Sequence, residues 1–401
     1  MKKYWFVLHQ DTFLWIKETD GLIYSSSNNH LFFRFRNEGI IARMTSDLQK
    51  TSNLYRTLVT EEDLSNQYVK EWIDTIVTSS CGKLVDLDNK NEISVSLKPI
   101  LKIQDTVSFY KVAHERHTDG KIIQNLLKLV IHLNGSAYGN DDIAKQLIFP
   151  KRTTETLEDI HRIKDFITSM GNPNFLIETI LVGNVWEYPM YQELLQFLQT
   201  FPFKLSIYCT EEDFINRKTI CGEKIIYHVL KTDYTRTPIH DDKLMHHFIV
   251  KSEEEYIKAC KMIEEVGLEN NYRILPLYSE KNKKFFNEFV YMDEEDICNL
   301  HLSKREVFAH QAINTNAFGT LHIDVEGNVY GDLNGKCLGV MEDGLYMLVY
   351  REMTEGNSWL RIRDQKPCCD CIYQWLCPSP SNYESVIGKP NLCHVKPSGQ
   401  E

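Results

Sequence analysis

Residues 126–135 read Leu126-Leu-Lys-Leu-Val-Ile-His-Leu-Asn-Gly135, an aliphatic run that ends at a turn-forming Asn-Gly pair. A short apolar run bounded in this way is typical of a strand buried on both faces. Further strands of this kind are expected at 175–182, 204–209, 224–230, 246–250 and 272–278, and amphipathic helices at 157–170, 191–198 and 252–267. Alternating strands and helices predict parallel βα units, in an open sheet or a partial barrel.

Two segments of different character flank this α/β region. Before it, short aromatic and β-branched runs separated by turn residues predict antiparallel strands, and a helix is expected over 61–79 with Thr60 as its N-cap. After it, Glu326-Gly327 lies between two short runs and predicts a hairpin. We therefore divide the chain into a small α+β module (1–92), an α/β domain (93–310) and a cysteine-rich domain (311–401).

The composition excludes several classes of protein. The 401 residues are 42% hydrophobic and 25% charged, with 45 basic and 56 acidic side chains, so the net charge is 45 − 56 = −11. An acidic chain lacks the basic face that sequence-independent nucleic-acid binding requires. No segment approaches the ~20 apolar residues of a membrane span, and the apolar run near Met1 is too short for a signal peptide. We expect a soluble cytoplasmic protein.

The cysteines carry the strongest chemical signal. Of eleven in the chain, Cys368, Cys371, Cys377 and Cys393 have the spacing of a four-thiolate metal site. In a reducing cytoplasm such clusters bind metal more often than they form disulfides. A [4Fe–4S] cluster and a structural zinc ion both accept four cysteines, so the spacing leaves both open. A redox CxxC or unliganded thiols are the alternative, and the role of Cys337 is left undetermined.

Motifs for other chemistry are missing from the sequence. There is no phosphate-binding Walker loop, no GxSxG nucleophile elbow, no HExxH zinc motif and no GxGxxG dinucleotide motif. The acidic run Asp293–Asp296 is interpreted as a solvated loop. The residues themselves therefore identify no catalytic site.

Several segments together resemble the radical-SAM peptide maturases with a C-terminal SPASM domain. Within that group the chain is most similar to the pseudo-radical-SAM proteins of the GG-Bacteroidales peptide (RiPP) maturation system. The segments that carry the resemblance are Lys3–Phe6, Val130–Gly135, Val182–Asn184, Phe318–Ile323, Cys371–Tyr383 and Gly388–His394. The resemblance implies a degenerate, radical-SAM-like partial (β/α)6 barrel, an N-terminal peptide-recognition-like module and a C-terminal SPASM-like domain.

The departures from the family pattern imply a pseudoenzyme. Active members follow their first barrel strand with CxxxCxxC, whose thiolates hold the cluster that cleaves S-adenosylmethionine. Here the loop reads Asn134-Gly-Ser-Ala-Tyr-Gly-Asn140 and contains no cysteine. The GGE-type segment after the second strand is replaced by Val182-Gly-Asn-Val-Trp-Glu-Tyr-Pro189. We therefore expect no S-adenosylmethionine cleavage and no catalytic residues.

The tail departs from the family in a second way. A full SPASM domain holds two auxiliary clusters, and Cys368, Cys371, Cys377 and Cys393 match the ligands of the second one. A ligand of the first cluster is replaced by Ser381, and the hairpin over 316–332 lacks cysteine. The resemblance thus implies one retained [4Fe–4S] cluster, with zinc as the alternative, and one lost cluster.

The N-terminal module is similar in arrangement to elements that bind a leader peptide by adding it to a sheet edge. On this chain the predicted edge comprises Leu22, Ile23 and Tyr24, and it faces a helix carrying Tyr68, Trp72 and Ile76. The alternative is an ordinary small domain whose aromatic residues form its core.

The predicted function is a non-catalytic partner in peptide maturation. Its expected partners are a precursor peptide and an active radical-SAM maturase, which it would bring together by raising their effective concentration. Two rivals remain: a redox enzyme or electron-relay protein that uses the tail cluster, and a structural zinc-binding interaction protein.

Overall fold

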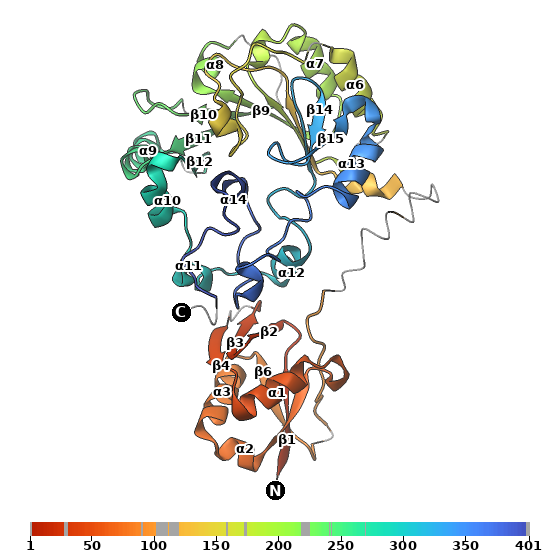
Figure 1. The fold of residues 1–401 in the computed structure, drawn as a ribbon, viewed down its shortest axis with the longest axis vertical. Coiled ribbons are helices and arrows are strands. Elements are labelled where there is room, and N and C mark those ends of the chain that lie inside the picture. Colours follow the sequence, from red (N-terminus) through yellow and green to blue (C-terminus); the bar gives the residue numbers. More distant parts are fainter. Residues whose placement is uncertain are drawn as a thin grey trace.

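The computed structural model describes residues 2–397 except 28–30, 90, 102–110, 112–119, 158, 172–174, 218–224, 240, 242 and 269. Two lobes are visible in Figure 1, with the N-terminal module at one end and a large sheet at the other. The C-terminal segment around helix α14 (Asn382–Ile387) lies between them (Figure 1).

A nine-stranded sheet forms the larger lobe, in the order β12-β11-β10-β9-β8-β7-β13-β14-β15. Its first six strands in chain order are β7 (Lys128–His132), β8 (Glu178–Val182), β9 (Lys204–Thr210), β10 (Ile225–Lys231), β11 (Leu244–Val250) and β12 (Tyr272–Pro276). They lie side by side in that order and all neighbours are parallel. The predicted α/β class with a mostly parallel sheet is confirmed.

The two faces of this sheet have different surroundings. Leu129, Ile131, Leu181 and Ile207 pack in the main core with helices α6 (Ile160–Thr168) and α7 (Tyr191–Leu198). Because side chains alternate along a strand, the residues between them point to the opposite, inner face. That face carries polar and ionisable side chains among aliphatic ones; they include Glu178, Ser206, Tyr208, His228 and His247.

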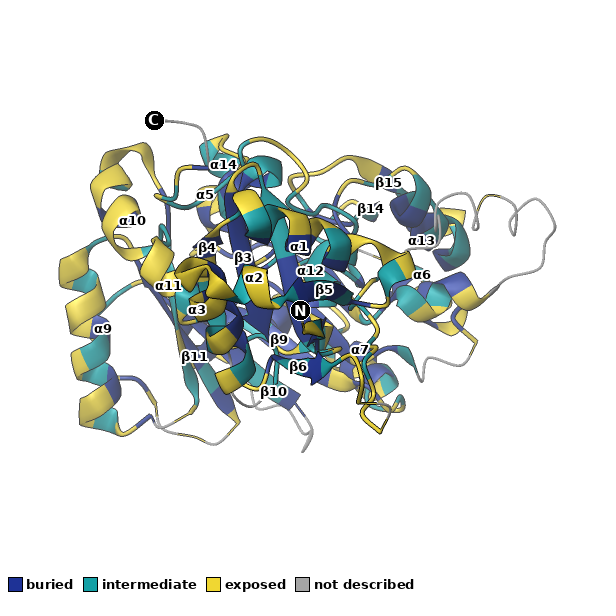
Figure 2. Cartoon of the chain, turned by 90° about the horizontal axis from the view of Figure 1, so that it is seen from below, coloured by how far each residue is buried: buried dark blue, intermediate teal, exposed yellow. Residues whose placement is uncertain are grey.

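Further helices follow β9 and β11. Helix α8 (Glu211–Ile215) is capped by Thr210 at the end of β9, and α9 (Glu253–Val266) begins at Ser252 and ends at Gly267. Gly267 adopts a left-handed conformation with φ 69°, which glycine accepts without strain. The outer side of α9 is exposed, whereas the strands behind it are buried (Figure 2).

The N-terminal module contains two three-stranded antiparallel sheets. One has the order β5-β1-β6, formed by β1 (Lys3–Leu8), β5 (Arg56–Thr60) and β6 (Gly82–Asp86). The other has the order β2-β3-β4, formed by β2 (Thr12–Lys17), β3 (Asp20–Ser25) and β4 (Phe32–Arg36). Helix α1 (Gly39–Gln49), which the sequence reading missed, closes the module's core together with Trp72.

The helix expected over 61–79 is two helices. Thr60 caps α2 (Glu61–Ser65) as predicted, through a capping box with Asp63. Asn66 then starts α3 (Gln67–Thr78), since its side chain accepts hydrogen bonds from the amides of Tyr68 and Val69. An asparagine that bonds the backbone in this way competes with helix continuation, which explains the break.

The prediction that Leu22–Tyr24 form an edge strand is wrong. These residues belong to β3, which is the central strand and pairs with both β2 and β4. Of the six residues proposed for peptide binding, five are at most 1% exposed and fill the hydrophobic cores; these are Leu22, Ile23, Tyr24, Trp72 and Ile76. Only Tyr68 is accessible, with 47% exposure. The free edges of this sheet are β2 and β4.

The C-terminal segment joins both lobes. Its strands β13 (Thr320–Ile323), β14 (Asn328–Tyr330) and β15 (Cys337–Val340) extend the large sheet, and β13 to β14 is the predicted hairpin. Helix α13 (Leu345–Thr354) packs in the same core. No helix within the described part of the chain is long and apolar enough to span a membrane.

The face of β2-β3-β4 that points away from α1 packs on the start of the C-terminal segment and on the cysteine loop. Two short helices support this contact, α11 (Glu294–Cys298) and α12 (Lys304–Ala312). The shared apolar cluster contains Phe13, Leu22, Tyr24, Ile297, Val307, Ile372, Tyr373 and Leu376. Tyr373 stacks on Phe32, and its hydroxyl donates to Glu294 and accepts from Arg34. The run Asp293–Asp296 is exposed, as interpreted from sequence, but it forms the N-cap and first residues of α11 rather than a loop, and Glu294 belongs to the interface.

Candidate functional site

The four predicted ligand cysteines lie on two loops that close around one space. Cys368 begins a single helical turn over 368–370, and the amide of Cys371 donates to the Cys368 carbonyl. Cys377 follows one turn later, with its amide bonded to the Tyr373 carbonyl. Cys393 comes from the last loop, where a parallel bridge to Met292 fixes it. Residues 25 positions apart therefore present their thiols to one site.

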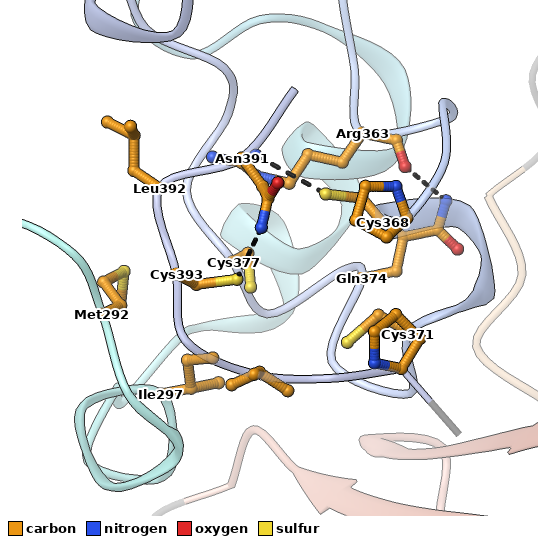
Figure 3. A pocket seen from close by; sticks show the side chains of 13 residues that line it. Met292, Ile297, Arg363, Cys368, Cys371, Gln374, Cys377, Asn391, Leu392 and Cys393 are labelled. Carbon is orange, nitrogen blue, oxygen red and sulfur yellow. Dashed lines mark hydrogen bonds between the residues drawn. The ribbon is translucent and has the colours of Figure 1, made fainter. Parts of the chain in front are cut away.

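All four thiols line the same cavity, which holds about 450 Å³ of empty space and is partly open to solvent. In Figure 3 the sulfurs of Cys368, Cys371, Cys377 and Cys393 face this space. The rest of the lining is mostly apolar, with Arg363, Gln374 and Asn391 as its polar members and no carboxylate. None of the ten described cysteines is in a disulfide. The predicted set is thus brought together as free thiols.

Two donors are aimed at the sulfurs. The guanidinium of Arg363 lies 3.8 Å from Cys368 Sγ, and the Asn391 side-chain amide lies 3.1 Å from Cys393 Sγ. Arg363 is itself held by Glu384 at 2.9 Å, and both side chains are buried, at 9% and 5% exposure. Donors placed beside thiolates lower the cost of their negative charge and tune any centre that they ligate.

Burial dominates the titration of these thiols. It raises the pKa of Cys368 and Cys377, and it raises the pKa of Cys371 to about 11, against the opposing effect of Arg363 on Cys368 and Cys377. At neutral pH the three thiols are therefore protonated. Metals bind the thiolate, so loading this site must release protons and becomes more favourable as pH rises.

The donor set is four thiols, which a [4Fe–4S] cluster and a structural zinc ion both accept. Among the described residues, no three His, Cys, Asp or Glu side chains are placed to hold one metal ion. A tetrahedral zinc site needs every sulfur about 2.3 Å from one point. A four-iron cluster would instead spread its four thiolates around a larger body. Cys368, Cys371, Cys377 and Cys393 would hold it, and a bound cluster would supply one-electron transfer.

The remaining cysteines lie outside this cavity where the structure describes them. Cys369 points to Asp370 rather than to the other thiols, as expected from its position next to Cys368. Cys337 is exposed on β15, bonded to the Gly339 carbonyl, and does not line the cavity. Cys221 lies outside the described residues.

Ser381 has a structural role that the sequence reading missed. It caps α14: its amide and its hydroxyl both donate to the Glu384 carboxylate, at 2.7 and 2.5 Å. The same carboxylate holds Arg363 beside Cys368. The spacing Ser381-x-x-Glu384 is a capping-box pattern and could have been found from sequence.

The cysteine-free loop after β7 is fixed by a buried polar network. Asp213, 3% exposed, accepts hydrogen bonds from Ser136 at 2.6 Å, Thr210 at 2.7 Å and Asn184 at 3.1 Å. Asn134 adds a bond from its side-chain amide to the Asn184 carbonyl, at 2.8 Å. The ends of β7, β8 and β9 are thus joined by five polar side chains, and the loop is closed against its neighbours.

Gly183 permits this closure. Its φ is +125°, and a Cβ at this position would lie 2.3 Å from both the backbone and side-chain oxygens of Asn134. Only glycine allows the loop after β8 to approach the loop after β7 so closely.

No protein-family model and no curated protein sequence matches the chain. Among solved structures, it is similar to Streptococcus suis SuiB bound to S-adenosylmethionine, with a TM-score of 0.44 and 12% identity over 98% of this chain and 99% of that one. It is also similar to SuiB bound to the precursor peptide SuiA, with a TM-score of 0.44 and 11% identity over 99% of both chains. Similarity this low assigns neither an activity nor a ligand to the chain.

Proposed function

We propose that the chain is a non-catalytic, pseudo-radical-SAM component of a system that matures a ribosomally synthesised peptide. It would bind the precursor peptide, an active radical-SAM maturase, or both, and hold one near the other. The family resemblance of the sequence suggests this role, and the loop between β7 and α5 (Asp141–Ala144) gives it its main structural support.

This loop is the observation that carries the proposal. A cluster that cleaves S-adenosylmethionine needs thiolates at this position, and the loop offers the side chains of Asn134, Ser136 and Tyr138 instead. Asn134 and Ser136 are already engaged in the Asp213 network. A loop with hydroxyl and amide side chains, tied to two neighbouring strand ends, is not a ligand set for a soft iron–sulfur centre.

The tail site would stabilise the fold and supply the docking platform for the N-terminal module. Tyr373 and Leu376 lie between Cys371 and Cys377 and belong to the apolar cluster that contacts Phe13, Leu22 and Tyr24. Lys17 of β2 also bonds the Cys369 carbonyl at 2.5 Å. A centre bound by the four cysteines would therefore rigidify the surface on which β2-β3-β4 rests.

The free edge of β4 is the best site for an added peptide strand. The Ser25 amide bonds the Leu31 carbonyl, and the Asn37 amide bonds the Thr19 carbonyl, so the odd residues of this strand pair with β3. Backbone groups of Phe32, Arg34 and Arg36 therefore point outward, because antiparallel strands alternate in this way. The Tyr68 hydroxyl bonds both the amide and the carbonyl of Arg36. The outward backbone groups of Phe32 and Arg34 can therefore pair with a peptide, whereas those of Arg36 are bonded to Tyr68.

One experiment tests the absence of radical chemistry. The full chain is purified anaerobically, reconstituted with iron and sulfide, and incubated with S-adenosylmethionine and dithionite. We expect iron and sulfide to bind through the tail cysteines while no 5′-deoxyadenosine forms. Formation of 5′-deoxyadenosine by this chain alone would refute the pseudoenzyme. Tight zinc binding with no iron or sulfide retained would favour the structural-zinc alternative.

A second experiment tests peptide binding at β4. A precursor peptide encoded beside this chain's gene is titrated against the wild type, Phe32→Pro and Phe32→Ala. Both variants lose the ring that stacks on Tyr373, but only proline also removes the outward amide. We expect Phe32→Pro to bind at least tenfold more weakly than Phe32→Ala. Equal affinities of the two variants would exclude strand addition at this edge.

A further inference from the structure

A second cavity lies on the inner face of the parallel sheet and shares no lining residue with the cysteine cavity. It holds about 1170 Å³ of empty space, partly open to solvent. Lys128, Glu178 and Arg273 line it near the starts of the parallel strands, and His322 lines it from β13 of the same sheet. Asp332 and Arg361 line it from the C-terminal segment. It is therefore bounded by ionisable groups from the sheet and from the C-terminal segment.

Glu178 is the acidic residue among the described strand residues that line the cavity, and two lysines compensate its charge. Glu178 is 9% exposed and lies between Lys128 at 3.7 Å and Lys204 at 3.6 Å. It also accepts a 2.6 Å hydrogen bond from the Ser206 hydroxyl. Two cations and one hydroxyl thus surround one carboxylate. Among the described side chains that line or flank the cavity on the sheet, Lys128, Lys204 and Arg273 therefore outnumber Glu178.

Arg273 of β12 is a third cation at this end of the sheet, and it is exposed. Its side chain lines the cavity, opposite His247 in the β11–β12 register, and it makes no hydrogen bond or ion pair with any described residue. Together with burial, its positive charge contributes to lowering the pKa of the buried His228 and His247. Burial, first, and then the positive charges of Lys204, Arg273 and Lys128 lower the pKa of His228 to about 3, so this imidazole is neutral near pH 7.

Other polar groups around the cavity also lack partners among the described residues. The Tyr208 hydroxyl, which borders the cavity, makes no hydrogen bond, although its ring stacks on His228. The Nδ1 atom of His322 and the Nε atom of Arg361 are buried without a hydrogen bond. Buried polar groups in proteins are normally satisfied, so unsatisfied ones around a cavity indicate a missing ligand or solvent.

We propose that this cavity binds an oxyanion-bearing ligand, with Arg273 and Tyr208 as its contacting groups. A carboxylate or a phosphate group presents the two or three acceptor oxygens that a guanidinium fork and a phenol can donate to. The excess of cations over carboxylates on the sheet wall would favour the negative charge. None of the tail cysteines and no residue of β4 lines this cavity, so oxyanion binding is tested separately from the proposed function.

The test is calorimetric titration of the full chain, at low ionic strength in a buffer without oxyanions. Sodium glutarate and sodium phosphate are the probes, and the variants are Arg273→Gln, Tyr208→Phe and the control Lys284→Gln. Lys284 is an exposed cation on α10 (Lys283–Phe289), with 88% side-chain exposure, and it does not line the cavity. Arg273→Gln removes one charge from a cavity wall without emptying a core position.

We expect saturable binding of at least one probe to the wild type, weakened tenfold or more by Arg273→Gln and several-fold by Tyr208→Phe, and unchanged by Lys284→Gln. Tighter glutarate would identify a carboxylate ligand such as an acidic peptide side chain, and tighter phosphate a phosphate ester. Failure of both probes to bind the wild type would overturn the proposal. So would equal losses in Arg273→Gln and Lys284→Gln, because they would reflect net charge alone.

Discussion

Replacing Asp213 with alanine should remove the hydrogen bonds that hold the loop after β7 in place. The carboxylate accepts hydrogen bonds from Ser136, Thr210 and Asn184, and these three donors come from the ends of three neighbouring parallel strands. Ser136 and Thr210 are themselves at most 4% exposed, so water cannot readily replace the lost acceptor. The variant therefore leaves two buried hydroxyls and one amide without their partner.

The expected cost follows from these three donors. A buried donor left unsatisfied costs about 1–3 kcal/mol, and bonds to a charged acceptor lie at the upper end. Some relaxation is available, because Asn184 is only part-buried and the alanine leaves a small cavity that the loop can enter. We therefore expect the free energy of unfolding to fall by about 4 kcal/mol.

Urea unfolding followed by circular dichroism measures the global effect, and hydrogen exchange of residues 134–140 measures the local one. The matched control is Asp142→Ala, because this carboxylate is 87% exposed and makes only a long 3.8 Å ion pair with Lys145. It should change stability by less than about 0.5 kcal/mol. A loss below 1 kcal/mol in Asp213→Ala, or unchanged exchange of the loop amides, would refute the network as the device that closes the loop.

Three further predictions concern the buried ionisable groups and the interface between the lobes. Arg363→Met should destabilise the chain by about 3 kcal/mol because it leaves Glu384 buried and unpaired; the double variant Arg363→Met, Glu384→Met should recover part of this loss in urea unfolding. His228 and His247 have pKa values lowered to about 3 by burial, against about 6.5 in the unfolded chain, so the unfolded state binds more protons below pH 6.5. The free energy of unfolding should therefore keep the full contribution of these histidines above pH 6.5 and fall by about 2 kcal/mol per histidine at pH 5. Replacing both histidines with glutamine should flatten this dependence of the unfolding free energy on pH. Tyr373→Phe removes the bonds to Glu294 and Arg34 and should cost about 1–2 kcal/mol, with faster proteolysis between the N-terminal module and the rest; unchanged cleavage would argue against these bonds as the link.

The local sequence pattern was sufficient to predict the strands of the parallel sheet. The runs that predicted strands at 126–133, 175–182 and 204–209 became β7, β8 and β9 with boundaries shifted by a few residues. Strands buried on both faces are apolar along their whole length, and this signal depends on no distant residue. The convergence of Cys368, Cys371 and Cys377 could also be foreseen, because a few intervening residues limit how far these thiols can separate.

Local pattern failed where a partner from another segment decided the outcome. Leu22–Tyr24 was placed at an edge because the module is similar in arrangement to peptide-recognition elements, yet β3 is the central strand and is buried by α1 on one side and the cysteine loop on the other. Asp293–Asp296 is exposed, as interpreted from sequence, but the contacts of Glu294 with Arg34 and Tyr373 could not be foreseen, because these partners are more than 70 residues away in sequence. Arg363 and Asn391 lie only five and two residues from Cys368 and Cys393, but residue type and spacing alone do not show which way their side chains point.

By itself the sequence determined the class of the large sheet, the four-cysteine set in the tail and the absence of thiols from the loop after the first parallel strand. These depend on residue type and short-range spacing. Tertiary structure alone decided that Asp213 closes that loop, that Arg363 and Glu384 stand beside the thiols, that β4 is the free edge, and that Arg273 lines a cavity. Each of these is a contact or an exposure created when segments far apart in sequence pack together, and burial, charge compensation and hydrogen-bond satisfaction exist only once that packing is formed.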